Sequence, residues 1–239
     1  MKRISALIAI SMVVLFSSCG SEPAKEETKA ADTTAAVTPP PGEVKPAFVP
    51  FKIFMIMHKV KNFDKWKVGY LAHDSVRLAN GLTQLQLGRA LKDTNMVYIV
   101  EKMDDLAKTQ AFTKSPGLKD AMKKAGVTSD PGFSYAIMVR GDDSPVPTDL
   151  RVGVAHHVKN FDAWLKVYDA EGPATRAANG MIDRGIARSL IDSNMVYLTF
   201  AVTDTAKARA RFASPDLKKI MTDAGVDSPP TTRWFRVVQ

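Results

Sequence analysis

The sequence predicts an α+β protein in which two tandem ferredoxin-like βαββαβ repeats pack sheet to sheet within one chain. The first observation is an internal duplication, because residues 52–139 recur in order as residues 151–238. The second is that each copy carries the order strand, helix, strand, strand, helix, strand. The third is that such a unit holds both helices on one face of its sheet. The other, apolar face then needs a partner, which the second copy supplies.

The duplication rests on several matched segments that keep their order. His58 matches His156, and the offset changes by one residue before Asn80-Gly81, which matches Asn179-Gly180. One residue has therefore entered the second copy between these points. The further matches are Val60–Trp66 with Val158–Trp164, Asp93–Tyr98 with Asp192–Tyr197, and Ser115–Lys119 with Ser214–Lys218.

The first copy shows how each element is predicted. Residues 53–60 are a mostly apolar run typical of a buried strand. Asn62 can cap a helix whose apolar side chains recur at helical spacing until Asn80-Gly81 stops it. Ser115-Pro116 starts a second helix that Gly126 ends. The remaining predicted elements are strands over 85–91, 96–103 and 133–139 and a helical segment over 104–114.

The first 18 residues are predicted to be a signal peptide rather than part of the fold. Lys2 and Arg3 precede an apolar run over 4–16 that is too short to span a bilayer. Phe16-Ser17-Ser18-Cys19 resembles the lipobox of bacterial lipoproteins. That resemblance implies cleavage before Cys19 and lipidation of its sulfur, which would anchor the protein to a membrane. The alternative is an ordinary secretory signal in which the cysteine has no role.

Residues 19–50 are predicted to be a disordered tether, because they contain a proline run and few large apolar residues. The predicted repeats cover 51–140 and 151–239, with a linker over 141–150. Acidic residues soon after Cys19 resemble the surface-export signals of some outer-membrane lipoproteins, and this resemblance implies the outer rather than the inner membrane of a bacterial cell envelope. The single cysteine excludes a disulfide framework.

Residues 51–140 carry most of the net charge of +8, which suits an anionic surface or ligand, or simply a solvated face. An exported, lipid-anchored chain without an aromatic and basic single-strand motif is not expected to bind nucleic acid.

The repeated segments also resemble a known superfamily. Asn62-Phe63-Asp64-x-Trp66 after His58, the Ser-Pro-x-Leu-Lys segment and the Ala-Gly-Val before the last strand are similar to those of the dimeric α/β-barrel superfamily. Within it, the chain resembles the antibiotic-biosynthesis-monooxygenase-like and cyclase-like stand-alone domains. The resemblance implies a fused version of a homodimer. It also implies relatives that include cofactor-free oxygenases, haem-degrading enzymes, isomerases and proteins without a known reaction.

His58 and His156 are the candidate catalytic residues, since each lies near the end of the first strand of its copy. Each shares strand parity with apolar neighbours. If that face points into the barrel, the pair would line one cavity. A histidine there can act as a general base or bind a metal or haem. The alternative is a structural histidine bonded to the backbone beside the following helix.

Arg89 and Arg188 are candidate ligand-binding residues, because each lies on an otherwise apolar strand face. An arginine there should meet a ligand anion or a carboxylate. Asp93 and Asp192 are the local carboxylates that would make the pairing purely structural.

Four aromatic residues are further ligand-binding candidates. Tyr98 and Tyr197 can donate a hydroxyl into a cavity, or pack in the core with one hydrogen bond. Trp66 and Trp164 can form a ligand wall, or pack helix on sheet as their spacing demands.

Taken together, these features predict a lipid-anchored cell-envelope protein whose barrel domain binds a small ligand or a partner. The alternative is a cofactor-independent monooxygenase- or isomerase-like enzyme that uses a barrel histidine as base. Phosphate-loop, zinc-protease and nucleophile-elbow motifs are missing, and no metal or cofactor is expected. The folded part is expected to be monomeric, because each copy covers the other's sheet.

Overall fold

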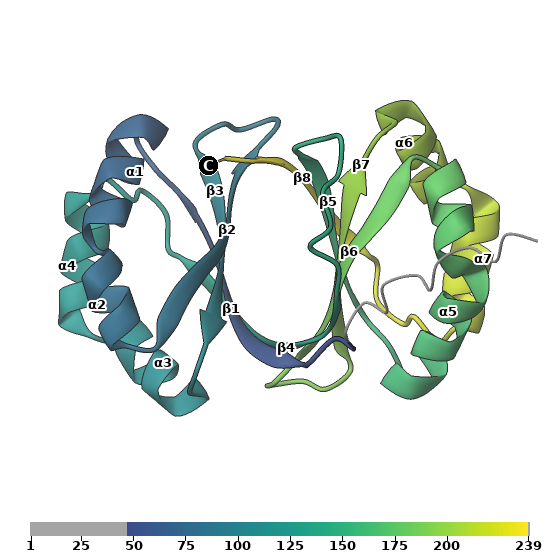
Figure 1. Cartoon of the computed structure of the whole chain (residues 1–239), viewed down its shortest axis with the longest axis horizontal. Coiled ribbons are helices and arrows are strands. Elements are labelled where there is room, and N and C mark those ends of the chain that lie inside the picture. Colours follow the sequence, from purple (N-terminus) through teal and green to yellow (C-terminus); the bar gives the residue numbers. More distant parts are fainter. Residues whose placement is uncertain (1–46, 239) are drawn as a thin grey trace, which may run out of the picture. The chain divides into compact units, whose positions relative to one another are not determined.

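Each repeat forms a four-stranded antiparallel sheet with its helices on one face (Figure 1). The structure, a computed structural model, describes residues 47–238. The predicted signal peptide and most of the predicted tether therefore lie outside the described residues. The first repeat contains β1 (Phe51–Lys59), α1 (Phe63–Ala72), α2 (Asp74–Ala79), β2 (Leu82–Ala90), β3 (Met96–Met103), α3 (Leu106–Thr113), α4 (Pro116–Lys124) and β4 (Gly132–Gly141). The second contains β5 (Leu150–His157), α5 (Phe161–Ala178), β6 (Met181–Ser189), β7 (Met195–Val202), α6 (Thr205–Ala213), α7 (Pro215–Asp223) and β8 (Thr231–Val237).

The helix starts that the sequence predicts are built by side-chain caps. The Asn62 carboxamide oxygen accepts a hydrogen bond from the backbone N–H of Lys65 at 2.9 Å, and Asn160 caps α5 in the same way. Ser115 caps α4, whose first residue is proline. After α2, Gly81 adopts the left-handed region with φ 74°, which is accessible to glycine at little cost.

The first long helix of each copy departs from the sequence prediction. In the first repeat it breaks at His73 into α1 and α2. In the second, α5 bends at Gly172, whose φ is 77°, immediately before Pro173. Proline lacks the N–H that would continue the helix, and it disfavours helical backbone in the residue before it. The one-residue difference between the copies falls within this bent segment.

The two sheets are joined edge to edge as well as face to face. The strand order is β4-β1-β3-β2-β8-β5-β7-β6, and β6 pairs again with β4 to close an eight-stranded barrel. Seam hydrogen bonds include Leu91 N–H to the Trp234 carbonyl at 3.0 Å and Leu190 N–H to the Tyr135 carbonyl at 2.9 Å. The predicted sheet-to-sheet arrangement is confirmed, and the seams additionally leave no sheet edge unpaired.

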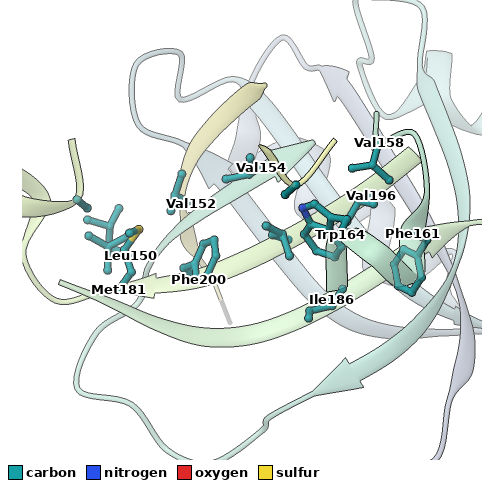
Figure 2. Packing of buried hydrophobic residues seen from close by; sticks show 14 residues of the cluster. Leu150, Val152, Val154, Val158, Phe161, Trp164, Met181, Ile186, Val196 and Phe200 are labelled. Atoms are coloured by element: carbon teal, nitrogen blue, oxygen red, sulfur yellow. The ribbon is translucent and has the colours of Figure 1, made fainter. Parts of the chain in front are cut away.

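Closure gives every strand one face toward the helices and one face toward the barrel interior. The helix-facing side chains of each repeat form their own core. Figure 2 shows the core of the second repeat, in which Trp164 and Phe161 of α5 lie near Val196 of β7 and near Val158, which follows β5. Inside the barrel, a smaller cluster of Ile53, Ala136 and Ala187 packs beside the β4–β6 seam.

The two seams carry side chains of different size at equivalent positions. A Cβ added at Gly88 would lie 2.5 Å from Cδ2 of Phe235 at the β2–β8 seam. At the β4–β6 seam the equivalent residues are Ala187 and Ala136, so the alanine of one strand faces a small residue instead of a phenylalanine.

We expect Gly88→Ala to destabilise the protein by about 1–3 kcal/mol, because the added methyl overpacks the seam against the Phe235 ring. Urea unfolding of Gly88→Ala and of Gly88→Ala combined with Phe235→Leu checks this, and the second change should restore part of the loss. Ala187→Gly is the matched control at the other seam and should cost about 1 kcal/mol or less. A Gly88→Ala protein as stable as the parent would contradict the packing described.

Candidate functional site

The two candidate histidines lie on the helix-facing side of the sheets, so they do not share one cavity in the barrel interior. His58 on β1 is 3% exposed, and its ring meets the edge of Trp66 on α1 with centroids 5.5 Å apart. His156 on β5 repeats this arrangement with Trp164 on α5. Each histidine therefore belongs to a separate helix–sheet pocket within its own repeat.

Neither histidine is held by the backbone. Nδ1 and Nε2 of both rings are buried without a hydrogen-bond partner among the described residues. Burial lowers the pKa of His58 and of His156 to about 4, so both imidazoles are neutral at pH 7. The backbone-bonded alternative is therefore not the arrangement that the fold adopts.

The pocket of the first repeat has a volume of about 60 Å³ beneath α1 and α4. Its walls are mostly apolar and aromatic. The polar side chains in them include His58, which lies against Trp66, and Glu101. A volume of this size holds a few water molecules or a ligand of a few heavy atoms. The lining residues are Phe54, Ile56, His58, Trp66, Gly69, Tyr70, His73, Arg77, Ile99, Glu101, Phe112, Leu118, Ala121, Met122, Ala125 and Phe133.

A buried ion pair forms the polar wall of this pocket. Glu101 on β3 is fully buried, and its Oε1 lies 2.9 Å from Nε of Arg77 and accepts a hydrogen bond from the Tyr70 hydroxyl at 3.1 Å. Arg77 also stacks on the Tyr70 ring at 3.8 Å and donates to the Tyr70 carbonyl. Burial nevertheless raises the pKa of Glu101, and its Oε2 has no partner.

The pocket of the second repeat keeps the arginine and the tyrosine, but the strand carboxylate that pairs with this arginine comes from β6 and does not line the pocket. Arg176, which matches Arg77, stacks on the Tyr168 ring at 3.9 Å and donates two hydrogen bonds to Asp183 of β6, at 2.7 and 2.6 Å. The position that matches Glu101 is Phe200, and the position that matches Asp183 is Gln84. The volume is similar, about 70 Å³.

A second carboxylate lies in the wall of this pocket. Glu171 bridges Arg176 at 3.3 Å and Arg211 of α6 at 2.6 Å. Phe112 matches Arg211 in the first repeat. The two pockets therefore share a His–Trp–Tyr–Arg frame and differ in their acidic groups.

Arg89 and Arg188 do not reach either pocket. Each donates from Nε to a carbonyl in the following turn, at Thr94 and Ser193 respectively, and each lies over a phenylalanine ring at the start of α1 or α5. Neither arginine pairs with the aspartate that the sequence suggested. Asp93 instead forms an ion pair with Lys59 at 2.7 Å, and Asp192 lies 3.6 Å from Nε2 of His157. These arginines brace the β2–β3 and β6–β7 turns.

Tyr98 and Tyr197 lie on the opposite strand face and line a cavity of about 400 Å³ inside the barrel. The Tyr98 ring packs against Phe235 of the other repeat, with centroids 5.4 Å apart. The structure therefore separates the candidates into two environments. Trp66 and Trp164 accompany the histidines, whereas the tyrosines face the barrel interior.

Sequence reasoning missed Arg77, Arg176 and Glu101. A usable signal was present, because the two arginines match between the copies and Glu101 is an acidic residue in the otherwise mostly apolar run of β3. Residues 47–238 contain no cluster of three or more His, Cys, Asp or Glu side chains that could hold a metal ion. No helix in the same range combines the length and apolar character that crossing a membrane requires.

Comparison with known proteins supports the fold. No protein-family model and no curated protein matches the chain. Among solved structures, a candidate monooxygenase from Fusobacterium nucleatum is 14% identical with a TM-score of 0.51, over 80% of this chain and 93% of its own. An anthrone oxidase-like protein is 13% identical with a TM-score of 0.52, over 79% and 92%. A Listeria monocytogenes ferredoxin-fold protein related to antibiotic biosynthesis monooxygenases has a TM-score of 0.46 at 10% identity, over 80% and 97%.

The candidate monooxygenase and the anthrone oxidase-like protein share the overall fold with this chain, and these two matches span both of its repeats. The fold that the sequence resemblance implied, an intramolecular α/β barrel of two ferredoxin-like repeats, is confirmed. At 13–14% identity the likeness concerns the fold alone.

The buried histidines make stability depend on acid in a defined direction. Their pKa is about 4 in the folded protein against 6.5 in the unfolded chain, so the unfolded state binds more protons between these values. Stability should therefore fall as the pH falls from about 6.5 to about 4. Between pH 7 and pH 4.5 each histidine should lower the free energy of unfolding by about 2–3 kcal/mol.

Urea unfolding at both pH values, in the parent and in His58→Phe/His156→Phe, measures this contribution. The double variant should lose less stability in acid. The control His157→Gln should lose at least as much as the parent, because Asp227 raises the pKa of His157 and this pair stabilises the folded protein in acid. An unchanged pH dependence in the double variant would contradict the buried, neutral state of the rings.

Proposed function

We propose that the protein is a lipid-anchored cell-envelope protein that binds small ligands in its two helix–sheet pockets. The observation that carries this proposal is the set of four unpartnered imidazole nitrogens in the two pockets. Buried polar groups in folded proteins are almost always hydrogen-bonded, and each one left unpaired costs about 1–3 kcal/mol. A ligand or water bound beside each ring would recover that cost.

The pockets limit the chemistry of the ligand. A neutral imidazole donates one hydrogen bond and accepts one, so the ligand should carry a hydroxyl or a similar donor and acceptor group. The Trp66 and Tyr70 rings stack with centroids 5.0 Å apart and make the adjoining wall apolar. The ligand should therefore be a small alcohol-like molecule with an apolar body of a few heavy atoms.

A second candidate function is a cofactor-independent monooxygenase- or isomerase-like reaction with His58 or His156 as the base. Two observations favour it, the fold shared with a candidate monooxygenase and an anthrone oxidase-like protein, and an imidazole free to accept a proton. Haem does not fit the helix–sheet pockets, because their volumes of about 60 and 70 Å³ hold only a ligand of a few heavy atoms.

An oxygen electrode separates the two candidates. Uptake of oxygen with anthrone, abolished in His58→Gln/His156→Gln, would favour the enzyme and would require the pockets to open, because anthrone is larger than their volumes of about 60 and 70 Å³. Its absence would favour binding alone.

Anchoring through Cys19 is the other half of the proposal. The basic start, the short apolar run and the lipobox-like segment support lipidation, and the acidic residues that follow favour the outer membrane. The barrel itself supports a monomeric folded part, because both sheets find their partners within one chain.

Ligand binding should be visible at the histidine rings themselves. In ¹⁵N spectra of the imidazoles, propan-2-ol should shift the His58 and His156 signals saturably, because its hydroxyl can meet the free ring nitrogens. The half-buried His157, which contacts Asp227 at 2.6 Å, is the internal control, and the shift of its signal should not saturate. Equal, linear shifts at all three rings would show a solvent effect and contradict the pocket assignment.

We expect Cys19→Ala to move the protein from the membrane fraction to the soluble fraction of a bacterial cell, because no lipid can then be attached. Immunoblots of the separated fractions check this, with Ser18→Ala as the neighbouring control. A Cys19→Ala protein that stays in the membrane fraction would contradict lipid anchoring.

A further inference from the structure

The cavity inside the barrel is separate from the two helix–sheet pockets and much larger. Its volume is about 400 Å³, within the range of sites for drug-sized ligands. Strands of both repeats line it, so neither repeat alone could form it. Figure 1 shows the two sheets facing each other around this interior, with all helices outside.

Arg233 is the only residue with a full charge in the lining of this cavity, and no acidic residue lines it. Its side chain is half-buried on β8, and no hydrogen bond or ion pair joins it to any other residue within 47–238. A half-buried guanidinium without a carboxylate is a poor structural element but a good anchor for an anion.

The rest of the lining suits an apolar body with a few polar contacts. Met55, Met57 and Phe235 supply apolar surface, and methionine adapts its shape to irregular ligands. Tyr98 and Tyr197, which each carry a hydroxyl, line the cavity from the two repeats. Burial raises the pKa of Tyr98, so its hydroxyl remains a donor at neutral pH.

The two repeats contribute different side chains to the lining of the cavity, which suits one ligand rather than two. Arg233 matches Ser134 in the other repeat, so the charge occurs once. Gly153 and Ala155 of β5 match Met55 and Met57 of β1, so the second repeat leaves space where the first fills it. The pseudo-twofold symmetry is thereby broken in both charge and volume.

We propose that the barrel interior binds one small organic acid, a carboxylate or sulfonate with an apolar body, whose anionic group pairs with Arg233. The apolar part lies against Met55, Met57 and Phe235, in the space that Gly153 and Ala155 leave open. This site lies on the opposite face of the sheets from the helix–sheet pockets, and His156 is among the strand residues that line both.

Two fluorescent probes of nearly equal shape test the proposal on the full chain. 1-Anilinonaphthalene-8-sulfonate carries an anion, and N-phenyl-1-naphthylamine lacks it. Arg233→Gln should weaken binding of the sulfonate about tenfold or more and change binding of the neutral probe less than about twofold. Arg236→Gln, on the same strand but exposed and paired with Asp149, is the matched control and should leave both affinities unchanged.

A second variant locates the site without touching the charge. Ala155→Met introduces the residue that the first repeat has at the matching position, Met57. The larger side chain fills part of the cavity and should weaken the binding of both probes about tenfold. Unchanged sulfonate binding in Arg233→Gln, equal weakening in Arg236→Gln, or unchanged binding in Ala155→Met would each overturn the proposal. His58→Phe should bind the sulfonate as the parent does, because His58 lines only the helix–sheet pocket of the first repeat, and a loss there would assign the probe to that pocket instead.

Discussion

Backbone pairing between β2 and β8 and between β4 and β6 is the constraint on which the rest of this structure depends. Two separate four-stranded sheets would each expose two edges and one apolar face. Pairing the edges satisfies the backbone groups and at the same time fixes which face of each sheet is enclosed. Every later feature, from the packing of the tryptophans to the position of the tyrosines, follows from that assignment of faces.

Closure creates two kinds of interior that duplication then shaped differently. The helix–sheet layers keep a common frame, in which His58, Trp66, Tyr70 and Arg77 recur in the second repeat. The acidic groups differ, because Arg77 pairs with Glu101 of β3 in one copy, whereas Arg176 pairs with Asp183 of β6 and Glu171 of α5 in the other. In the barrel, by contrast, equivalent positions differ strongly in size and charge. The duplicated pockets therefore retain one chemistry twice, whereas the shared cavity is a single asymmetric site.

The sequence was sufficient for the fold and insufficient for the site. Repetition, the Asn62 and Ser115 caps and the glycine stops are local signals, and each appears in the structure where the sequence predicts it. Strand parity grouped His58 with apolar residues but could not choose its face, because both faces of a barrel strand are covered. The partners of Arg77 are distant in sequence, so Glu101 could be found only after folding.

Native-state hydrogen exchange at the seam amides tests the closed barrel most directly. The N–H groups of Leu91, Leu190 and Val238 donate across the seams at 2.9–3.0 Å. Closure predicts that they exchange as slowly as amides between strands of one repeat, such as those joining β1 and β3. Exchange at the rate of exposed edge strands, with the β1 and β3 amides still protected, would show two repeats that stand apart and would contradict this account.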